Sequence, residues 1–584
     1  IYTQNRVASA TPQLPAAVIT QGVTTQKTTT SYIMVLSLFS ADGRYDETFL
    51  SNYAMLNIKD RIARINGVGQ VQVLGSGAYA MRVWIKPDKM DYLGLTVADI
   101  AGAITSQSEV VPGGQLGAEP TAEKPDFTYT VRMPSPYNTA EQFGNVIVRA
   151  NPDGSLVRLH DVATIELGTQ SYSVSSTYQG HDAVLMIINQ SPGSNAVQVG
   201  KEVKALLSEM SQSFPEGITY DTLVDSTKTI TSGIQDIVTT LLIALLLVIA
   251  VIYLFLQDFR ATFVPLIVIP VALIGAFMLF PLFGFSVNVF SLLGLVLAIG
   301  LVVDDAIVVI EAVEYEIKYN ARSPREATII AMENVQNPVI GVACVLAAVF
   351  IPVGFISGMS GILYRQFALT IAVSVLISAF VALTLTPAMC ASILNVHKPN
   401  DNPKGIYKFF QKFNDAFDRL IAWYGLRLAH LQLHLKWCVA FLVIISALTA
   451  GVFKVMPTGF VPSEDNAFVM MNVTLPEGIS QTETKQVSEQ ISKWLEQQPG
   501  VTSVMNVVGF SILANGPKSN GATSFIGMSD WDERKDKSLS VDALVGKIMG
   551  MGNQIPQATV IAMNPPPIDG MGTSSGFTMQ LENR

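Results

Sequence analysis

One apolar run that contains two adjacent acids constrains this chain most. The run VFSLLGLVLAIGLVVDDAIVVIEAV occupies residues 289–313. It is long enough to cross a bilayer, since about 20 apolar residues in a helix span the hydrocarbon core. Asp304 and Asp305 lie near its middle. A carboxylate at that depth costs roughly 2.5–3.5 kcal/mol on insertion scales, and such residues normally face the bundle interior and mark an ion or proton path. We therefore predict that this helix takes up and releases protons.

Composition supports a membrane protein. Of the 584 residues, 49% are hydrophobic and only 14% are charged, which together with long apolar runs is typical of membrane helices. The net charge of −9 argues against nucleic acid as a partner, because a phosphate-binding surface should be basic. The sequence shows no phosphate loop and no metal-ligand cluster, so we expect no metal and no cofactor apart from a proton gradient. Both ends resemble the middle of domains, and we expect a fragment of a longer protein.

Six hydrophobic segments are predicted to cross the membrane, which would put both flanking polar regions on the same side. The connections 258–260, 315–335 and 395–436 carry nearly all the basic residues of the loops, so the positive-inside rule places them in the cytoplasm and the polar regions in the periplasm. Residues 405–430 repeat aromatic and aliphatic residues at helical spacing between lysines. They predict an amphipathic helix, either on the cytoplasmic membrane surface or packed on the end of the bundle. The six segments are 237–257, 261–283, 289–313, 338–356, 367–394 and 437–453.

The polar regions alternate strands with helices. Residues 31–40 have strand composition, a helical pattern covers about 46–65, and a strand covers 70–74. A strand–helix–Gly-Val–strand unit recurs at 467–507, which indicates a duplicated protein. Residues 127–133 alternate apolar and polar residues and predict a half-buried strand. We therefore expect a membrane α-helical bundle of six helices plus α+β, ferredoxin-like βαβ units outside the membrane.

The two acids suggest proton binding more than catalysis. Adjacent helix positions differ by about 100° in direction, so Asp304 and Asp305 do not form a face-to-face pair of the kind an intramembrane aspartyl protease needs. Two acids close together in a low dielectric resist joint ionisation, so one of them is expected to hold a proton. The alternative to proton binding is that a buried acid forms a permanent ion pair with a basic residue. Lys454, at the end of the last hydrophobic segment, is the only lysine or arginine that the other five segments offer for such a pair.

A loop in the second polar region is a candidate binding element. Phe510, Ile512 and Phe525 flank or neighbour the Gly-, Asn- and Ser-rich stretch 509–521. A flexible loop between apolar anchors can line a binding cleft, although aromatic residues at strand ends also commonly belong to a core. Both interpretations remain open at this stage.

Several motifs resemble one family of exporters. The run GLVLAIGLVVDDAIVVIEAVE at 294–314 resembles the signature helix of resistance–nodulation–division (RND) exporters, and the doubled aspartate is similar to the hydrophobe/amphiphile efflux branch. The resemblance covers essentially the whole chain. It extends to YLFLQDFRAT at 253–262, YRQFALTIAVS at 364–374, ALTLTPAMCA at 382–391 and PTGFVPSEDNAF at 457–468.

The resemblance implies a domain organisation. The chain would lack the first membrane helix and the C-terminal part of the full-length protein. Residues 457–568 would form a porter subdomain of the second half, and 569–584 the truncated start of the next one. The transmembrane bundle would cover 228–456. In the first half, 1–30 would end one porter subdomain, 31–77 with 169–227 would form a second, and 78–168 would be a docking-type insertion.

The resemblance also implies a function, namely proton-driven efflux of hydrophobic or amphiphilic compounds, with Asp304 and Asp305 as the proton-binding pair. The full-length protein would be a homotrimer in the inner membrane of a Gram-negative bacterium, working with a periplasmic adaptor protein and an outer-membrane channel. Unlike the best-known drug pumps, this chain has aliphatic or sulfur-containing residues at several pocket positions where aromatics are common, including Met505. The matching substrate-binding positions are Phe510, Phe525, Val507, Ile512, Leu74 and Val224.

Two other functions remain alternatives. A truncated, non-transporting membrane scaffold would need neither acid. An intramembrane aspartyl protease would need a second catalytic acid from a facing helix. Dye efflux by the complete protein that depends on a proton gradient distinguishes an exporter from the scaffold.

Overall fold

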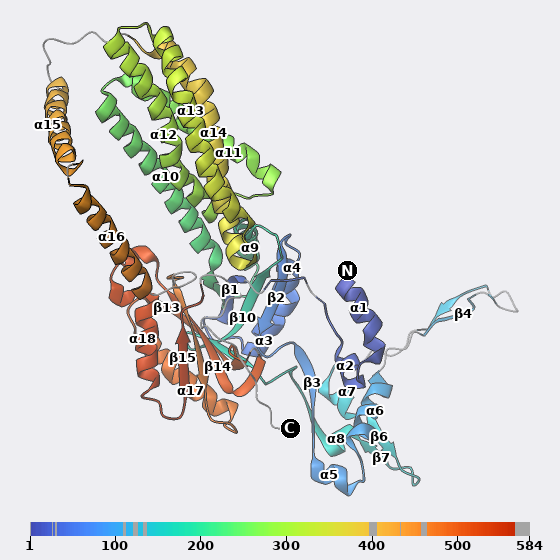
Figure 1. Ribbon diagram of the computed structural model, residues 1–584. Helices are drawn as coiled ribbons and strands as arrows, with labels where there is room; N and C mark the ends of the chain where they lie inside the picture. Colours follow the sequence, from blue (N-terminus) through green and yellow to red (C-terminus); the bar gives the residue numbers. More distant parts are fainter. Residues whose placement is uncertain are drawn as a thin grey trace. The chain divides into compact units, whose positions relative to one another are not determined.

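The computed structural model of the chain forms two compact units, residues 1–227 with 461–584 (the α+β unit) and residues 228–460 (the helical unit). Figure 1 shows the elements of both units. The segment 569–584 and the first residues of the motif at 457–468 lie outside the described residues. The structure describes residues 2–25, 27–29, 32–108, 113–118, 120, 126–131, 137–395, 406–432, 434–456, 464–514 and 516–566.

The helical unit confirms the six predicted membrane segments, since six of its helices are long and apolar enough to cross a membrane. The helices are longer than the predicted segments, because hydropathy identifies only the apolar part of each helix and not its polar ends. Residues 315–335, expected as a connection, are helical except around 321–323. The six helices are α10 (Ser226–Leu256), α11 (Phe259–Phe283), α12 (Val289–Asn320), α13 (Pro324–Phe350, continued by a 3-10 turn at Ile351–Phe355), α14 (Gly358–Ile393) and α16 (Leu435–Val455).

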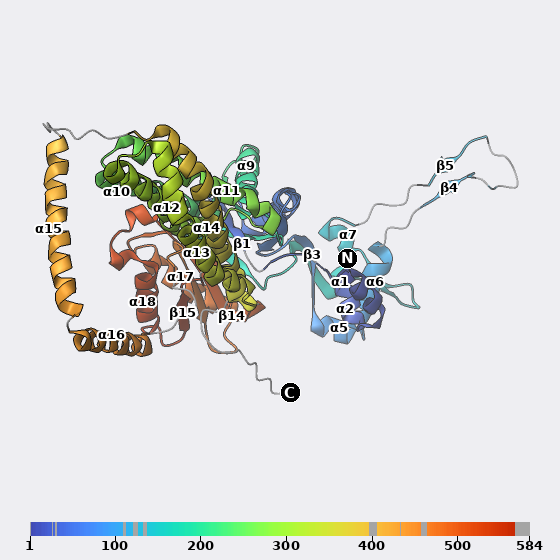
Figure 2. The same ribbon diagram turned by 45° about the horizontal axis from the view of Figure 1, so that its top comes forward.

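The core of the helical unit lies where α12 meets α11, α13 and α14 (Figure 2). Small residues bring these helices together: a Cβ added to Gly294 on α12 would lie 3.0 Å from the Phe367 carbonyl oxygen of α14. Such close approach of backbones is the usual basis of helix association in lipid. In contrast, none of the apolar window of α16 is buried against the other described residues.

The predicted amphipathic helix is α15 (Ile406–Gln432). Its first turns pack on α10, where Phe410 contacts Tyr253 and Phe413 contacts Phe255 at ring-centroid distances of 5.8 and 5.6 Å. Its later apolar residues, Leu420 and others, are exposed. The expected packing on a neighbouring helix is therefore seen for the first part of α15, and membrane-surface binding stays a prediction for the rest.

The α+β unit is built on one nine-stranded sheet that joins residues from both halves of the chain. Its path is β11-β1-β10-β9-β13-β14-β12-β15, and β2 also pairs with β10. The pairings along this path are antiparallel. The strands are β1 (Tyr32–Ser40), β2 (Val68–Leu74), β9 (Ser175–Tyr178), β10 (His181–Gln190), β11 (Ile218–Asp225), β12 (Phe468–Thr474), β13 (Val501–Ser511), β14 (Gly516–Met528) and β15 (Thr559–Met563).

Helices cover one face of each half of this sheet. In the first half, α9 (Ala196–Ser211) and the helix predicted at 46–65 bury residues such as Leu50 and Val203. The predicted helix is confirmed, but its middle turns are π-helical: α3 (Glu47–Tyr53), a π-helix (Ala54–Lys59) and α4 (Asp60–Ala63) follow one another. The strand–helix order of the first half is repeated in the second, as the repeat predicted.

The second half covers its face with α17 (Gln481–Leu495) and α18 (Val541–Gly552), which bury Val487, Ile491 and Ile548 against β12–β15. Two 3-10 turns, Trp531–Glu533 and Lys537–Leu539, connect β14 to α18.

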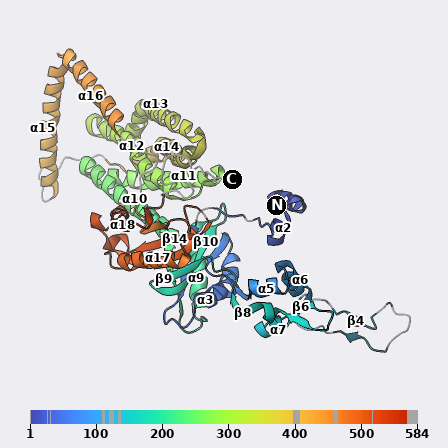
Figure 3. The same cartoon turned by 90° about the horizontal axis from the view of Figure 1, so that it is seen from below.

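The insertion between β2 and β9 has its own small core around Ile100 and Leu159 (Figure 3). The predicted half-buried strand at 127–133 is wrong for its described residues: only Tyr129–Thr130 form a strand, and both are exposed. Alternation alone does not bury a strand that has a single short partner. The remaining elements are α1 (Tyr2–Ala10), a 3-10 turn (Thr11–Gln13), α2 (Ala16–Gln21), β3 (Tyr79–Ile85), α5 (Pro87–Tyr92), α6 (Val97–Ser108), β4 (Gln115–Leu116), β5 (Tyr129–Thr130), α7 (Ala140–Gly144), β6 (Ile147–Ala150), β7 (Leu156–Arg158), α8 (Leu159–Val162) and β8 (Ala163–Thr169).

Candidate functional site

Asp305 is buried in the helical unit, with 6% of the residue exposed. The Ser378 hydroxyl of α14 lies 2.8 Å from Asp305 Oδ2 and 2.9 Å from the Val302 carbonyl oxygen. A hydroxyl has one proton to donate, so Ser378 can satisfy one of these acceptors at a time. When Asp305 is ionised, the serine can donate to its carboxylate; when Asp305 is protonated, the serine can donate to the Val302 carbonyl oxygen and accept from the carboxyl group.

Asp304 lies on a different side of α12. It is exposed, so burial among the described residues is seen for Asp305 and not for Asp304. The reason is the helical rotation of about 100° between neighbouring positions, which turns one acid toward α14 and the other away from it. The structure therefore separates the two acids into a buried and an exposed site.

The sequence interpretation missed the hydroxyl groups of α14. Thr370, Ser374 and Ser378 recur every four residues on this helix, and each is at most 1% exposed. The Ser374 hydroxyl donates to the Thr370 carbonyl oxygen at 2.8 Å, whereas the Thr370 hydroxyl has no hydrogen-bond partner among the described residues. The four-residue spacing of hydroxyl residues in an apolar helix was the signal that would have revealed this polar stripe.

A second candidate site is the apolar interior of the curled sheet. The face of the sheet opposite the helices is apolar, and residues from both halves of the chain pack into one cluster on it. The Tyr32 and Phe468 rings meet edge to face at 6.2 Å, and Leu223 of β11 approaches Gly527 of β14. The sheet thus curls until strands far apart in its order face each other. Curled sheets of this kind commonly enclose ligand sites.

The structure brings all six predicted substrate-binding residues into this one cluster, hereafter the apolar cluster. Val224, Val507 and Phe525 are buried in it, together with Met505. The other three predicted residues, Phe510, Ile512 and Leu74, are partly buried and pack against it. The side chains fill the interior in this structure, so a ligand would have to separate them.

Gly509 gives the β13–β14 hairpin its shape at the edge of the apolar cluster. Its φ of +84° belongs to the region that L side chains rarely adopt, and a Cβ there would collide with the Ser173 carbonyl oxygen. The register of β13 against β14 shifts between Val508 and Phe510. The expectation of a flexible loop at 509–521 is wrong for most of its described residues, because β13 continues to Ser511 and β14 begins at Gly516. Glycine therefore lets this hairpin lie against the segment that precedes β9.

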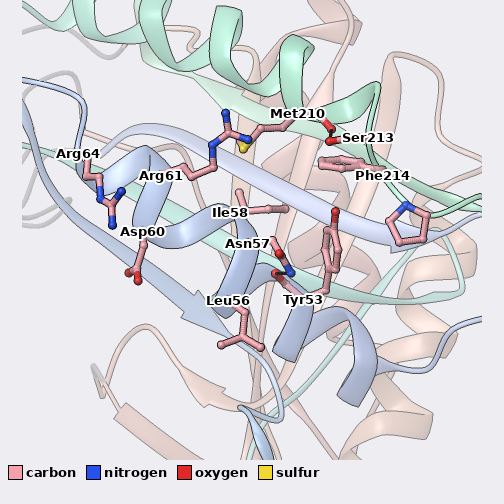
Figure 4. A pocket seen from close by; sticks show the side chains of 11 residues that line it. Tyr53, Leu56, Asn57, Ile58, Asp60, Arg61, Arg64, Met210, Ser213 and Phe214 are labelled. Carbon is pink, nitrogen blue, oxygen red and sulfur yellow. Dashed lines mark hydrogen bonds between the residues drawn. The ribbon is translucent and has the colours of Figure 1, made fainter.

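The α+β unit also has a surface pocket of about 590 Å³ between the π-helix and the C-terminal end of α9. Figure 4 shows Tyr53 and Phe214 at one end and Arg61 with Arg64 at the other. The guanidinium group of Arg61 lies 3.0 Å from Glu209. None of the six predicted substrate-binding residues lines this pocket, which opens on the helical face of the sheet.

The chain combines a bundle of membrane-length helices, which holds a buried carboxyl group, with a large α+β unit that has an apolar interior. These features are those of a polytopic membrane protein. The chain belongs to the AcrB/AcrD/AcrF family of RND proteins, whose family model matches residues 2–584. With six membrane-length helices, it is an integral protein of the inner membrane.

Relatives share sequence along the whole chain. It is 37% identical to the multidrug resistance protein MdtF of Escherichia coli K12 and 36% identical to the multidrug export protein AcrF of the same strain; each match covers 100% of this chain and 56% of the relative. It is also 36% identical to the toluene efflux pump membrane transporter TtgB of Pseudomonas putida, covering 100% of this chain and 55% of the relative. The chain therefore spans about half the length of these relatives. AcrF is named as an exporter and TtgB as a membrane transporter, and none of the three names describes an enzyme.

Proposed function

We propose that the full-length protein exports hydrophobic or amphiphilic compounds and that a proton gradient drives the export. The observation that carries this proposal is the buried carboxyl group of Asp305 beside the Ser378 hydroxyl, 2.8 Å away, within a bundle of membrane-length helices. A carboxyl group at that depth is costly, and such groups in membrane helices usually have a function. No further cofactor is required for this cycle.

The apolar cluster is the proposed substrate site. Its lining from both halves of the chain suits compounds with an apolar body, because burial of apolar surface stabilises a complex by about 25 cal/mol per Å². Aliphatic and methionine side chains such as Val507 and Met505 adapt to ligands of different shape. Broad selectivity for hydrophobic compounds is the expected result.

The names of AcrF and TtgB support the same class of function, since they describe multidrug export and toluene efflux. By the family's organisation, we propose that the full-length protein is a homotrimer that works with a periplasmic adaptor protein and an outer-membrane channel. A non-transporting scaffold would not need Asp305 in the bundle. An aspartyl protease is disfavoured, because a serine hydroxyl is the hydrogen-bond partner of Asp305.

The experiment is dye efflux by cells that express the full-length protein as Asp305→Asn or Asp304→Asn. Asparagine keeps the size and much of the hydrogen bonding of the aspartate but does not titrate, so both variants should insert in the membrane and lose efflux. Ser392→Ala, which removes an exposed hydroxyl bonded to the helix backbone of α14, is the control. Efflux at the wild-type rate by Asp305→Asn, at equal membrane expression, would refute the proposal.

A further inference from the structure

An asparagine with an unpaired oxygen lies on the apolar side of the curled sheet. Asn189, near the end of β10, is 7% exposed, and its Oδ1 has no hydrogen-bond partner among the described residues. Buried polar atoms are nearly always paired in folded proteins, because an unpaired one loses the hydrogen bonds that water gives it in the unfolded chain. Internal water or a bound ligand can supply the missing partner. This amide group is therefore a candidate contact for a ligand.

The burial pattern of β10 places Asn189 on the face that carries the apolar cluster. Met186 and Ile188 pack under the helices that cover the other face. Leu185 is buried in the apolar cluster, and Ile187 packs against it. Side chains alternate between the two faces of a strand, so Asn189 continues the row of Leu185 and Ile187.

The pairing of β10 with β1 agrees with this placement. Asn189 lies opposite Tyr32 in the antiparallel ladder, and opposite residues in such a ladder project from the same face. The Tyr32 side chain packs against the apolar cluster, and its ring meets Phe468 edge to face at 6.2 Å. Asn189 is therefore a polar group in an apolar lining to which both halves of the chain contribute.

Two glutamines of β2 add polar groups beside Asn189. Gln70 lies opposite Asn189 and Gln72 lies opposite Ile187, so both glutamines project from the same face. Gln72 Nε2 donates to Gln70 Oε1 at 3.3 Å. Both glutamines and Tyr32 are only partly buried. This end of the apolar cluster is thus more polar than the rest, and its neighbours leave Asn189 close to solvent.

We propose that Asn189 makes the apolar cluster selective for apolar compounds that carry a carboxamide group. The asparagine amide presents an acceptor oxygen and two N–H donors in one plane, so a ligand carboxamide can form two antiparallel hydrogen bonds with it. The apolar body of the ligand then packs in the apolar cluster. This rests on the function proposed above and adds the polar group of the substrate.

The basis of the selectivity is the cost of an unpaired polar atom in an apolar interior. A ligand without an N–H group excludes water from Asn189 Oδ1 and leaves this acceptor unsatisfied, so its affinity falls. Sites that hydrogen-bond a ligand group discriminate in this way against the analogue that lacks the group. One N–H group at this position should change the affinity about tenfold.

The test is equilibrium binding of two tritiated probes to the purified full-length protein in detergent, where no proton gradient exists. One probe is 1-naphthamide, and the other is 1-acetonaphthone, which has a methyl group in place of the NH2 group and nearly the same size. The ratio of the dissociation constant of the ketone to that of the amide should be about tenfold lower in Asn189→Leu than in the wild type. Asn189→Ala, which adds no bulk, should lower this ratio by a similar factor.

A matched control lies on the helix-covered face of the same half. Asn57 of the π-helix is exposed, and its Nδ2 donates to the Tyr53 carbonyl oxygen at 3.3 Å. Asn57→Leu makes the same exchange outside the apolar cluster and should keep the wild-type ratio. A substitution that only loosens the fold weakens the binding of both probes by one factor and leaves the ratio unchanged.

The proposal is overturned if an Asn189 variant that binds both probes keeps the wild-type ratio, or if Asn57→Leu lowers the ratio as much as Asn189→Leu does. It is also overturned if the wild type does not bind 1-naphthamide. These outcomes differ from failure of the proposed function, which is measured by efflux in Asp305→Asn and does not require Asn189.

Discussion

Arg534→Met is predicted to destabilise the second half of the α+β unit strongly. The Arg534 side chain is 1% exposed, and its Nη1 and Nη2 donate to the two carboxylate oxygens of Asp465 at 3.0 and 2.9 Å. The same guanidinium group donates to the carbonyl oxygens of Ser529 and Leu539. Methionine fills similar volume but leaves all four acceptors without this donor.

The expected loss of unfolding free energy in Arg534→Met follows from the burial of the ion pair. Removal of one partner from a buried ion pair costs about 3–5 kcal/mol, because the other charge is left uncompensated. Asp465 is 31% exposed at its side chain and still accepts from the Ala467 and Val541 N–H groups, so water and backbone compensate part of the loss. We therefore expect Arg534→Met to lower the free energy of unfolding by about 3 kcal/mol, the lower end of this range.

The pH dependence of this effect has a definite sign. Burial alone would raise the pKa of Asp465, but the hydrogen bonds from Arg534, Val541 and Ala467 outweigh it and hold the pKa below its usual range. A carboxylate with a lowered pKa contributes stability above its unfolded-state pKa of about 3.9, and that stability is lost as the pH falls through the lower folded-state value. The cost of Arg534→Met should therefore be the same at pH 7 and pH 6.

The assay is pulse proteolysis of the full-length protein in detergent across a urea series. Trp531 offers a local reporter, since its indole N–H donates to the Asp465 carbonyl oxygen at 2.8 Å. Asp465→Asn combined with Arg534→Met should recover about 1–2 kcal/mol relative to Arg534→Met alone, because the unpaired charge is gone. A loss below about 1 kcal/mol for Arg534→Met, or no recovery in the double variant, would contradict the argument.

Three further predictions concern the bundle and the hairpin. Ser378→Ala should slow proton-driven dye efflux about 2- to 10-fold, the equivalent of one hydrogen bond to Asp305, and Ser378→Thr should preserve more of it; equal rates would count against a role for the hydroxyl. Gly294→Leu should lower the thermal unfolding temperature of the protein in detergent, since the added atoms meet α14 within 3.0 Å; an unchanged temperature would mean that the helices separate freely. Gly509→Val should reduce dye binding and stability together, because valine strains the positive φ and collides with the Ser173 carbonyl oxygen; normal binding would show that this turn does not shape the site.

The sequence predicted the elements with regular patterns. The six apolar runs and the strand–helix repeat were identified because hydropathy and residue spacing report directly on burial. Helix ends were predicted less well, because α12 and α14 continue into polar residues whose helical state depends on neighbouring helices.

The site depended on contacts that no local pattern encodes. That Asp305 and not Asp304 is buried follows from the rotation of α12 against α14, which the apolar run alone does not specify. Leu74 and Phe525 belong to one apolar cluster only because the sheet curls and joins both halves of the chain.

The short strand β9 has a mechanical consequence. Its backbone pairs with β13 from Ser175 opposite Val508 to Tyr178 opposite Met505, and the same strand turns into β10. Force applied to either duplicated half is therefore transmitted through peptide hydrogen bonds and not through side chains alone. For a ligand to enter the apolar cluster, the strands would have to bend or twist together as one sheet. Separation of the two halves would break the hydrogen bonds between β9 and β13. The flexibility of the whole sheet, rather than a hinge between β9 and β13, would then limit the size of the ligand that the interior can bind.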